Sequence, residues 1–275
     1  MMKIENYILE ECLGKGSFGE VYLTTLPNDP NKYATKLYDR AVIENSEAKK
    51  YLENEIKILR LLNHPNIIKC YSVFRDPNNK YIYFIMELMN NGDLESFKEA
   101  FQNLKTNPPE RILWKIFYDC LKGLTYIHDE EIIHRDIKPR NLFFDEHMKI
   151  KIGDFGLATR YSTSKLLRAN KIEGTPLYLS PEQTTFKSYN EKVDIYACGI
   201  TLYEMCSCFY TSMERYESIT NLRNNEIIDE KVVKNYPEET ELIKLMTKKD
   251  YNERPTANEI LKSDLFINLG KKLGF

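Results

Sequence analysis

The spacing of the apolar residues changes near residue 90, and this change limits the folds open to the chain. Before it, short alternating apolar runs are separated by glycine and proline turns, which is typical of strands, and only residues 44–62 have helical spacing. Two further runs, 67–74 and 81–88, also predict strands. After residues 90–93 (NNGD), helical spacing dominates. The pattern predicts an α+β fold, in which a small antiparallel β-sheet unit with one main helix precedes a larger, mainly helical unit.

The composition is that of a globular protein able to bury a core. The chain has 275 residues, 42% of them hydrophobic and 29% charged, and a formal net charge of −2. This charge creates no field that would attract nucleic acid, and the apolar run Tyr81–Met86 is far shorter than the roughly 20 residues that span a bilayer. Because the N-terminus also lacks a secretory signal core, we expect a cytoplasmic protein with no direct nucleic-acid or membrane contact. The six cysteines have no paired C-x-x-C spacing, so we expect reduced, mostly buried thiols.

A glycine motif near the N-terminus fits the pattern G-x-G-x-x-G-x-V. It runs from Gly14 to Val21, and an alternating, strand-like stretch follows it. Glycines let a backbone approach phosphate oxygens closely and offer N–H groups to them. A dinucleotide-binding loop should open a helix, whereas these glycines cap a hairpin between two strands. On its own, the motif is equally compatible with an ordinary hairpin turn.

A lysine on the third predicted strand is the next candidate. Lys36 shares a face of that strand with Ala34, whose small side chain leaves room for a flat ring. Its natural partner is Glu55 on the following helix, although Glu53 or another charge of that helix could equally face solvent. A strand lysine is otherwise an ordinary solvated edge residue, so a functional role for this pair depends on support from motifs further along the chain.

Two polar motifs interrupt the helical pattern between residues 132 and 159, among short β-like segments. The first has the sequence HRDIKPRN (residues 134–141), and the second has the sequence DFG (residues 154–156). An HRD triplet alone can occur by chance in a surface turn. The conjunction of both motifs with the glycine motif and the strand lysine, in this order, makes chance an improbable explanation.

These motifs supply the groups that phosphoryl transfer requires. The reaction needs an attacking hydroxyl held in line, metal ions that bridge the phosphates, and positive charge near the transferred group. Asp136 can accept the proton of the hydroxyl, and Lys138 can neutralise the γ-phosphate. Asn141 and Asp154 can hold magnesium through hard oxygen ligands.

The combination resembles the eukaryotic protein kinase family, in its serine/threonine form because Lys138 accompanies Asp136. The resemblance covers residues 7–266 and implies the bilobal protein kinase fold, with a small lobe of about residues 1–88, a hinge of about 87–92 and a large lobe of about 93–275. It implies that ATP and Mg2+ are the cofactors and that a protein hydroxyl accepts the phosphate. The catalytic residues that it implies are Asp136, Lys138, Lys36 and Glu55, with Asn141 and Asp154 as the metal ligands.

The resemblance also implies which residues contact the nucleotide. Met86 corresponds to the gatekeeper, and Glu87 to Met89 correspond to the hinge whose backbone binds adenine. Asp93 corresponds to a ribose contact and Phe143 to the floor of the adenine site. The complete set of ATP-binding positions is Leu13, Gly14, Lys15, Gly16, Ser17, Phe18, Gly19, Glu20, Val21, Ala34, Lys36, Met86, Glu87, Met89, Asp93 and Phe143.

A long polar stretch, residues 160–174, leads into GTPLYLSPE (residues 174–182), which resembles the end of a kinase activation segment. In the family, a glutamate at the position of Glu182 pairs with an arginine at that of Arg254 to stabilise the fold. An aspartate at the position of Asp194 supports the catalytic loop there, and Thr175 is similar to the residue that closes the site beside the acceptor hydroxyl.

The activation segment departs from the family in one respect. Asn170 stands where the family commonly carries an activating threonine, five residues before Thr175. Arg135 still implies a phosphate or an acidic partner in the loop. The candidate phosphosites are Ser162, Thr163, Ser164 and Thr175, and the first three could equally be simple polar loop residues.

The C-terminal part points to a subgroup of the family. Segments within residues 213–223 and 235–266 resemble kinases that phosphorylate the alpha subunit of translation initiation factor 2. This resemblance implies translation regulation, a docking helix near Thr220 and a homodimer through the small lobe. The chain departs from that group because only residues 76–80 separate the fourth and fifth predicted strands, where the group carries a long insert.

Two alternatives stay open. One is a serine/threonine kinase of another pathway, since cell-cycle kinases share HRDIKPxN and a compact chain. The other is a pseudokinase scaffold, which uses the fold without turnover, although the chain retains every motif residue that turnover requires. Because the motifs fill the chain almost end to end, we expect regulation to come from the activation segment or from partner proteins.

Overall fold

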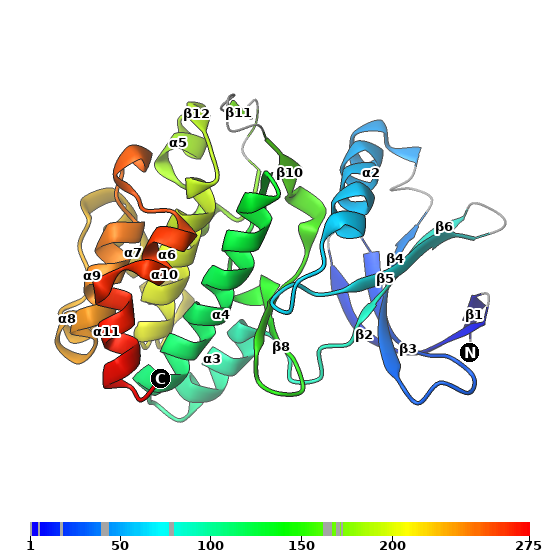
Figure 1. Ribbon diagram of the computed structural model, residues 1–275, viewed down its shortest axis with the longest axis horizontal. Coiled ribbons are helices and arrows are strands. Elements are labelled where there is room, and N and C mark those ends of the chain that lie inside the picture. The colour runs from blue at the N-terminus through cyan, green and yellow to red at the C-terminus, as the bar shows by residue number, and fades with distance from the viewer. Residues whose placement is uncertain are drawn as a thin grey trace.

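The computed structural model describes residues 2–4, 6–16, 19–39, 44–76, 80–161, 167–168, 171 and 173–275. These residues form two lobes, one built on a β-sheet and the other mainly helical (Figure 1). The predicted α+β class and bilobal architecture are therefore confirmed.

The small lobe contains an antiparallel sheet of six strands in the order β1-β2-β3-β4-β6-β5. A long helix, α2 (Ser46–Leu61), lies beside this sheet (Figure 1), close to the predicted range 44–62. The first strand precedes those that the sequence predicts. The strands are β1 (Met2–Ile4), β2 (Tyr7–Gly16), β3 (Gly19–Thr25), β4 (Lys32–Asp39), β5 (Cys70–Arg75) and β6 (Tyr81–Glu87).

The large lobe is dominated by helices: α3 (Leu94–Asn103), α4 (Glu110–Asp129), α5 (Pro181–Thr184), α6 (Lys192–Cys206), α7 (Ser212–Asn225), α8 (Glu230–Asn235), α9 (Pro237–Met246), α10 (Ala257–Lys262) and α11 (Asp264–Lys272). Short strands form pairs between them: β7 (Ile132–Ile133), β8 (Leu142–Phe144), β9 (Ile150–Ile152), β10 (Thr159–Arg160), β11 (Leu167–Arg168) and β12 (Ser188–Tyr189). Single 3-10 turns are η1 (Pro139–Asn141), η2 (Phe155–Leu157), η3 (Pro176–Tyr178) and η4 (Tyr251–Glu253). Within the ranges given above, no helix has both the length and the apolar run needed to cross a bilayer.

The start of β5 differs from the sequence prediction. β5 begins at Cys70, whereas the apolar run begins at Ile67. The intervening backbone pairs with β9 of the large lobe instead: the Ile68 N–H donates to the Ile152 carbonyl at 2.9 Å, and the Ile152 N–H donates to the Asn66 carbonyl at 2.8 Å. The strand-like run is thus divided between the small sheet and a backbone link that joins the two lobes.

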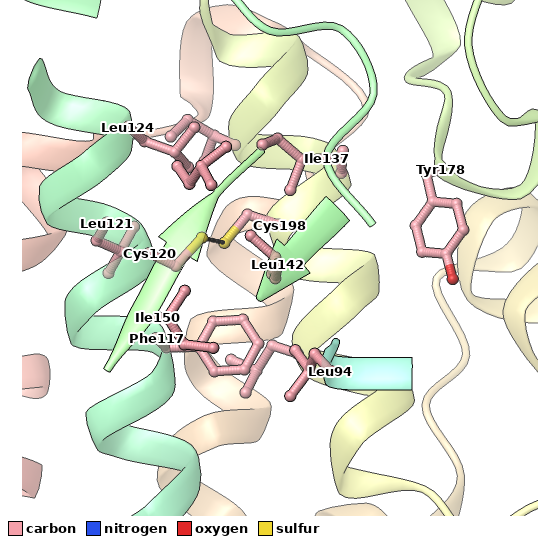
Figure 2. Packing of buried hydrophobic residues seen from close by; sticks show 14 of the residues in the cluster. Leu94, Phe117, Cys120, Leu121, Leu124, Ile137, Leu142, Ile150, Tyr178 and Cys198 are labelled. Carbon is pink, nitrogen blue, oxygen red and sulfur yellow. Dashed lines mark hydrogen bonds between the residues drawn. The ribbon is translucent and has the colours of Figure 1, made fainter. Parts of the chain in front are cut away.

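Helix α6 forms the centre of the large lobe. Every residue from Val193 to Cys206 is buried, because apolar residues occur on every side of this helix and such a helix belongs inside a core. Figure 2 shows how it packs against α4, where Cys120 faces Cys198 with 3.9 Å between the two sulfur atoms. This core fixes the position of the first turn of α6, which supports the catalytic loop.

All six cysteines are free thiols, as predicted. The prediction that they are mostly buried holds for half of them. Cys120, Cys198 and Cys206 are buried, Cys70 and Cys208 are half-buried, and Cys12 is exposed.

The apolar run of residues 258–266 at the C-terminal end is divided between two helices, α10 and α11. Ser263 separates α10 from α11 because its backbone is extended, with φ −70° and ψ 143°. Its hydroxyl accepts a hydrogen bond from the Phe266 N–H at 3.2 Å, which caps α11. A serine inside an apolar pattern can therefore start a new helix rather than continue the old one.

Candidate active site

The catalytic loop lies between β7 and β8, and a carboxylate of α6 holds it. Asp194 accepts hydrogen bonds from the backbone N–H groups of His134 and Arg135, each at 2.8 Å. Nε2 of His128 lies 2.9 Å from the same carboxylate. These bonds hold Arg135 at φ +67°, a left-handed conformation that residues other than glycine seldom adopt. Asp194 thus supports this loop, as the sequence suggested.

Asp136 has both carboxylate oxygens engaged. Its Oδ2 accepts from Lys138 Nζ at 2.6 Å and from Asn141 Nδ2 at 2.9 Å. Its Oδ1 accepts from the hydroxyl and the N–H of Thr175 at 2.8 and 3.1 Å. Lys138 Nζ also donates to the Thr175 hydroxyl at 2.7 Å. The structure therefore brings together three predicted site residues and the threonine of the activation segment, and these hydrogen bonds hold the Asp136 carboxylate in one orientation.

A second cluster joins the small lobe to the DFG motif. Lys36 Nζ lies 3.1 Å from Glu55 Oε1 and 3.0 Å from Asp154 Oδ1. The Tyr38 hydroxyl donates to Glu55 Oε2 at 2.6 Å. Burial alone would lower the pKa of Lys36, but attraction to Glu55, Tyr38 and Asp154 outweighs it and raises the pKa well above its usual value. Lys36 therefore keeps its positive charge at physiological pH.

Asn141 and Asp154 offer the oxygen atoms predicted to hold Mg2+. The charge of Lys36 holds the pKa of Asp154 below its usual value, so this carboxylate is ionised at neutral pH. Asn141 Nδ2 donates to the backbone carbonyl of Asp136 at 2.7 Å, which leaves the amide oxygen of Asn141 available as a ligand. Carboxylate and amide oxygens are hard donors of the kind that Mg2+ prefers, so the donor set fits the ion.

The glycine motif forms the predicted hairpin between β2 and β3. Lys15 lies opposite Glu20, and their side chains form an ion pair of 2.6 Å across the two strands. Ser17 and Phe18, predicted to contact ATP, lie outside the described residues.

The glycines of this motif have different surroundings. A Cβ on Gly19 would lie 1.9 Å from the carbonyl oxygen of Leu37 in β4, so packing within the sheet requires glycine at that position. A Cβ on Gly14 would meet no atom within 4 Å. Gly14 thus borders open space, as a backbone that admits phosphate groups must.

Apolar residues predicted to surround adenine come from both lobes. Ala34 of β4 and Met86 of β6 are partners in the sheet register. Leu13 and Val21 lie on the two strands of the glycine hairpin, and Leu13 is 46% exposed. Phe143 is half-buried in β8 of the large lobe. These positions fit a flat base that both lobes contact.

Several hydrogen-bonding groups of the hinge residues already have partners within the protein. The Glu87 N–H donates to the Lys69 carbonyl at 2.9 Å, and the Glu87 carboxylate lies 2.9 Å from Lys151 Nζ. Asp93 caps α3, since its Oδ1 accepts from the Ser96 N–H at 2.8 Å. The Glu87 N–H, the Glu87 carboxylate and one carboxylate oxygen of Asp93 are therefore already engaged. Met89 is half-buried.

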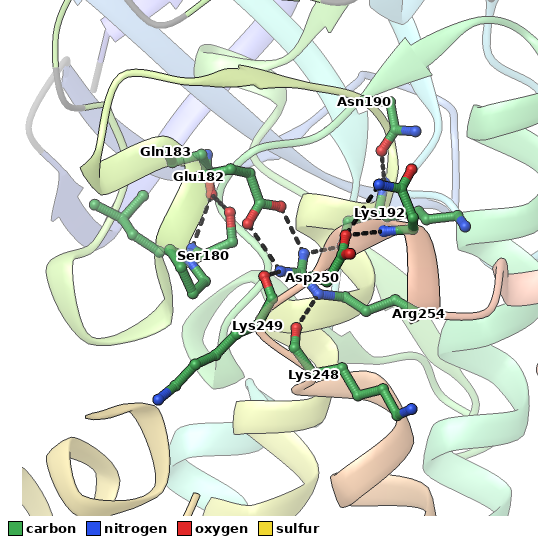
Figure 3. A network of polar contacts seen from close by, with 12 residues as sticks. Ser180, Glu182, Gln183, Asn190, Lys192, Lys248, Lys249, Asp250 and Arg254 are labelled. Carbon is green, nitrogen blue, oxygen red and sulfur yellow. Dashed lines mark hydrogen bonds and ion pairs between the residues drawn. The ribbon is translucent and has the colours of Figure 1, made fainter. Parts of the chain in front are cut away.

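The C-terminal end of the activation segment is anchored by a buried ion pair (Figure 3). Arg254 Nη1 and Nη2 donate to the two carboxylate oxygens of Glu182 at 2.6 and 2.8 Å. The guanidinium also donates to the backbone carbonyls of Lys248, Lys192 and Lys249. The pair that the sequence suggested is present and holds three segments together. Among the candidate phosphosites, Ser162, Thr163 and Ser164 lie outside the described residues.

Sequence reasoning missed three residues that hold this site: Tyr38, His128 and Glu173. Tyr38 follows Lys36 by two positions and so shares its face of β4, a signal that the strand alternation contained. Glu173 forms an ion pair with Arg135, but nothing in the local pattern distinguishes it from the other polar residues of its stretch. The sequence indicated only that Arg135 needs a phosphate or an acidic partner.

The sequence comparisons agree with this geometry. The family described as "Protein kinase domain" matches residues 7–266. The chain therefore belongs to the protein kinase family, whose members use ATP and Mg2+. Together with the relatives described next, the match supports protein serine/threonine kinase as the enzyme class.

Curated relatives match over almost the whole chain. The chain is 35% identical to "Probable serine/threonine-protein kinase nek2" of Dictyostelium discoideum, over 94% of this chain and 62% of that protein. It is 32% identical to "Serine/threonine-protein kinase Nek2" of Homo sapiens, over 97% of this chain and 61% of that protein. A shorter match, 36% identical over 74% of this chain and 38% of the relative, is "Calcium-dependent protein kinase 4" of Plasmodium berghei. The chain spans about three fifths of the length of the two Nek2 relatives.

Proposed function

We propose that this chain transfers the γ-phosphate of ATP to a serine or threonine hydroxyl of a protein substrate. The observation that carries the proposal is the arrangement around Asp136, whose carboxylate is held by Lys138, Asn141 and Thr175 in the activation segment. An acceptor hydroxyl that reaches this carboxylate finds a proton acceptor and a positive charge in one place.

Each residue then has a defined task in the transfer. The acceptor oxygen forms a bond to the γ-phosphorus, the bond from that phosphorus to the β–γ bridging oxygen breaks, and ADP leaves. Asp136 takes the proton of the acceptor hydroxyl, while Lys138 balances the charge on the transferred group. Lys36, held by Glu55, contacts the phosphates that stay on ADP. Asn141 and Asp154 would hold Mg2+, which would supply positive charge to the phosphate oxygens.

A pseudokinase is the weaker alternative. Its fold would be the same, but such a protein needs no set of polar residues poised for turnover. Here Lys36 is paired with Glu55 at 3.1 Å, and Asp136 is held by Lys138 at 2.6 Å. These contacts favour an active enzyme.

The substitution Asp136→Asn tests the proposal, with transfer from radiolabelled ATP to casein as the measurement. We expect the transfer rate to fall by at least about 100-fold, because proton acceptance contributes roughly 10²–10⁴-fold, while ATP still binds. Asp129→Asn, an exposed residue at the end of α4, is the matched control and should leave the rate unchanged. Unchanged transfer by Asp136→Asn would refute the assignment.

For the physiological substrate, the relatives favour the alternative over the initiation-factor reading. The Nek2 relatives are named as serine/threonine protein kinases, and their similarity supports a serine/threonine kinase of another pathway, such as a cell-cycle-like kinase. Phosphorylation of the alpha subunit of translation initiation factor 2 in translation regulation stays a prediction. The same is true of a homodimer through the small lobe and a cytoplasmic location.

One face of α7 is a candidate docking surface for a protein substrate. In α7, Met213 and Tyr216 are 64% and 55% exposed, whereas Ile219 and Leu222 of the same helix are buried. This face is open for a substrate to dock. We expect the chain to label casein, and the initiation-factor alpha subunit is tested beside it. Labelling of that subunit, absent when its acceptor serine is replaced by alanine, would restore the narrower hypothesis.

A further inference from the structure

We propose that Glu173 is a positioning residue, whose carboxylate supplies the negative charge that Arg135 requires and thereby assembles the active site without phosphorylation of the activation segment. This inference rests on the proposed kinase function. The sequence indicated that Arg135 needs a phosphate or an acidic residue as its partner, and the inference identifies this partner as the unmodified side chain of Glu173.

The Glu173 carboxylate contacts two elements that lie far apart in the chain. Its Oε2 lies 2.6 Å from Arg135 Nη1 of the catalytic loop, with both side chains about nine-tenths shielded, at 14% and 13% exposed. Its Oε1 accepts a hydrogen bond from the hydroxyl of Tyr51 in α2. Each oxygen thus serves a different element, and the carboxylate links the catalytic loop to the helix of the small lobe.

The surroundings of Arg135 explain why this carboxylate matters. The guanidinium donates through Nε to the Leu157 carbonyl at 2.7 Å and through Nη1 to the Tyr189 hydroxyl at 3.3 Å, and both acceptors are neutral. Asp194 is occupied by the backbone N–H of Arg135. Within the described part of the chain, Glu173 is the acidic group in ion-pair contact with the guanidinium, so it balances a largely shielded positive charge.

Tyr51 carries the effect to the nucleotide site. It precedes Glu55 by four residues in α2, so the two side chains lie on the same face of the helix, one turn apart. Glu55 in turn pairs with Lys36 at 3.1 Å. The contact of Glu173 with Tyr51 therefore fixes the turn of α2 that presents Glu55 to Lys36.

A nearby lysine and a second attachment limit the size of the effect. Lys171 Nζ lies 3.5 Å from Glu173 Oε1 and 4.9 Å from the centre of the Tyr51 ring. Independently, Asn54 Nδ2 donates to the Ala158 carbonyl at 2.6 Å and ties α2 to the segment after the DFG motif. Loss of Glu173 should therefore weaken the position of α2 rather than release the helix.

The test compares the full chain with Glu173→Gln after both are treated with phosphatase and shown by intact mass to carry no phosphate. Initial rates on a neutral peptide give kcat and KM. We expect the unphosphorylated wild type to be active and kcat of Glu173→Gln to fall by about 10- to 100-fold, a usual range for coupling between sites. Glu53→Gln, which removes a charge from the exposed face of α2, is the matched control and should leave kcat unchanged.

Two further variants separate positioning from general damage. Glu173→Asp keeps the charge on a shorter side chain and should restore part of kcat, whereas Tyr51→Phe removes one hydrogen bond and should lower kcat by about 2- to 5-fold. If Glu173→Gln fails to fold, Tyr51→Phe decides the question. Equal kcat for wild type and Tyr51→Phe, or for wild type and Glu173→Gln, overturns the inference. So does a wild type that gains activity only when its loop is phosphorylated.

A readout that needs no activity separates this inference from the proposed function. Hydrogen exchange of residues 46–61 should be faster in Glu173→Gln than in the wild type, and unchanged in Glu53→Gln. If the wild type transfers no phosphate at all, the proposed function fails, and the exchange rates still decide whether Glu173 positions α2. Identical exchange in α2 for wild type and Glu173→Gln overturns the inference.

Discussion

Two arginine–glutamate ion pairs anchor the activation segment, and they are built differently. Arg254 and Glu182 are 0% and 3% exposed in their side chains and are joined by two parallel hydrogen bonds. Arg135 and Glu173 are 13% and 14% exposed, and Nη1 of Arg135 lies 2.6 Å from Oε2 of Glu173. The same two residue types thus form a fully buried ion pair at the C-terminal end of the segment and a partly exposed ion pair near the catalytic loop.

The partners of each pair sharpen the difference. The remaining donors of Arg254 reach backbone carbonyls, and its guanidinium lies 4.8 Å from the centre of the Tyr196 ring. Glu173 instead shares its carboxylate with Tyr51 of the other lobe. A pair whose groups all serve one rigid site contributes to folding, whereas a pair that spans two movable elements sets how these elements are placed. We therefore expect the first pair to control stability and the second to control rate.

The largest expected effect is on stability, from Glu182→Gln. This change leaves a buried guanidinium without its counter-charge, which typically costs about 3–5 kcal/mol of folding free energy. Arg135→Gln should lower the free energy of unfolding by less than Glu182→Gln does, because its pair is only partly buried and Lys171 Nζ lies 3.5 Å from the Glu173 carboxylate. Urea unfolding at neutral pH measures both, with Glu253→Gln, an exposed ion-pair partner of Lys248, as the control. Similar losses for Glu182→Gln and Arg135→Gln would erase the proposed difference.

Site residues that lie within one local motif can be predicted from the sequence more readily than contacts between distant segments. The residues around Asp136 lie within one short motif, so their spacing alone places Lys138 and Asn141 beside it. Lys36 and Glu55 follow from the order of strand and helix. Each of these groups is close in sequence to a recognisable turn, strand or helix, and local patterns report such neighbours.

Contacts between distant segments were not predictable in the same way. The run that starts at Ile67 has strand spacing, but whether it joins the small sheet or β9 depends on where the two lobes meet. Glu173 and Tyr51 meet only because the activation segment returns to α2. Ser263 has an ordinary local context, and tertiary packing makes it a helix cap rather than a helix residue. These outcomes depend on packing of the whole molecule, which periodicity does not encode.

A second buried glutamate has no arginine partner among the described residues. Glu239, in the first turn of α9, is 2% exposed, and within the described ranges its carboxylate makes no ion pair or hydrogen bond with another residue. Burial raises its pKa to about 7, and Glu110 and Glu238 nearby add to this, while Lys272 opposes it. Glu239 thus contrasts with Glu182. Both carboxylates are buried, but of the two only Glu182 has an arginine, within the described part of the chain, that balances its charge.

The pH dependence has a definite sign. Since the pKa of Glu239 is raised from 4.5 to about 7 on folding, the native state favours the protonated form, and its stabilising contribution is complete below pH 4.5 and lost as the pH rises through about 7. Glu239→Gln is neutral throughout. It should match the wild type near pH 5 and be more stable at pH 8 by up to about 3 kcal/mol. Thermal unfolding across this range measures it, with exposed Glu241→Gln as the control. If the stability of Glu239→Gln and that of the wild type changed in parallel with pH, the raised pKa of Glu239 would be contradicted.

The smallest expected effect is on salt dependence, and it tests the more open of the two pairs directly. Dissolved ions screen charges that water reaches, and they screen buried pairs much less. Raising sodium chloride from about 0.05 to 0.5 M should therefore weaken Arg135–Glu173 only slightly, because the two side chains are 13% and 14% exposed, and should lower kcat of the unphosphorylated wild type by at most about 2-fold. Glu173→Gln has no such pair to lose, so its kcat, although lower, should change little with salt. The peptide substrate must be neutral and saturating, because its own binding would otherwise respond to salt. Equal fractional losses in the wild type and Glu173→Gln would show that the salt effect arises elsewhere, and the rate-controlling role of the pair would then lose its simplest electrostatic support.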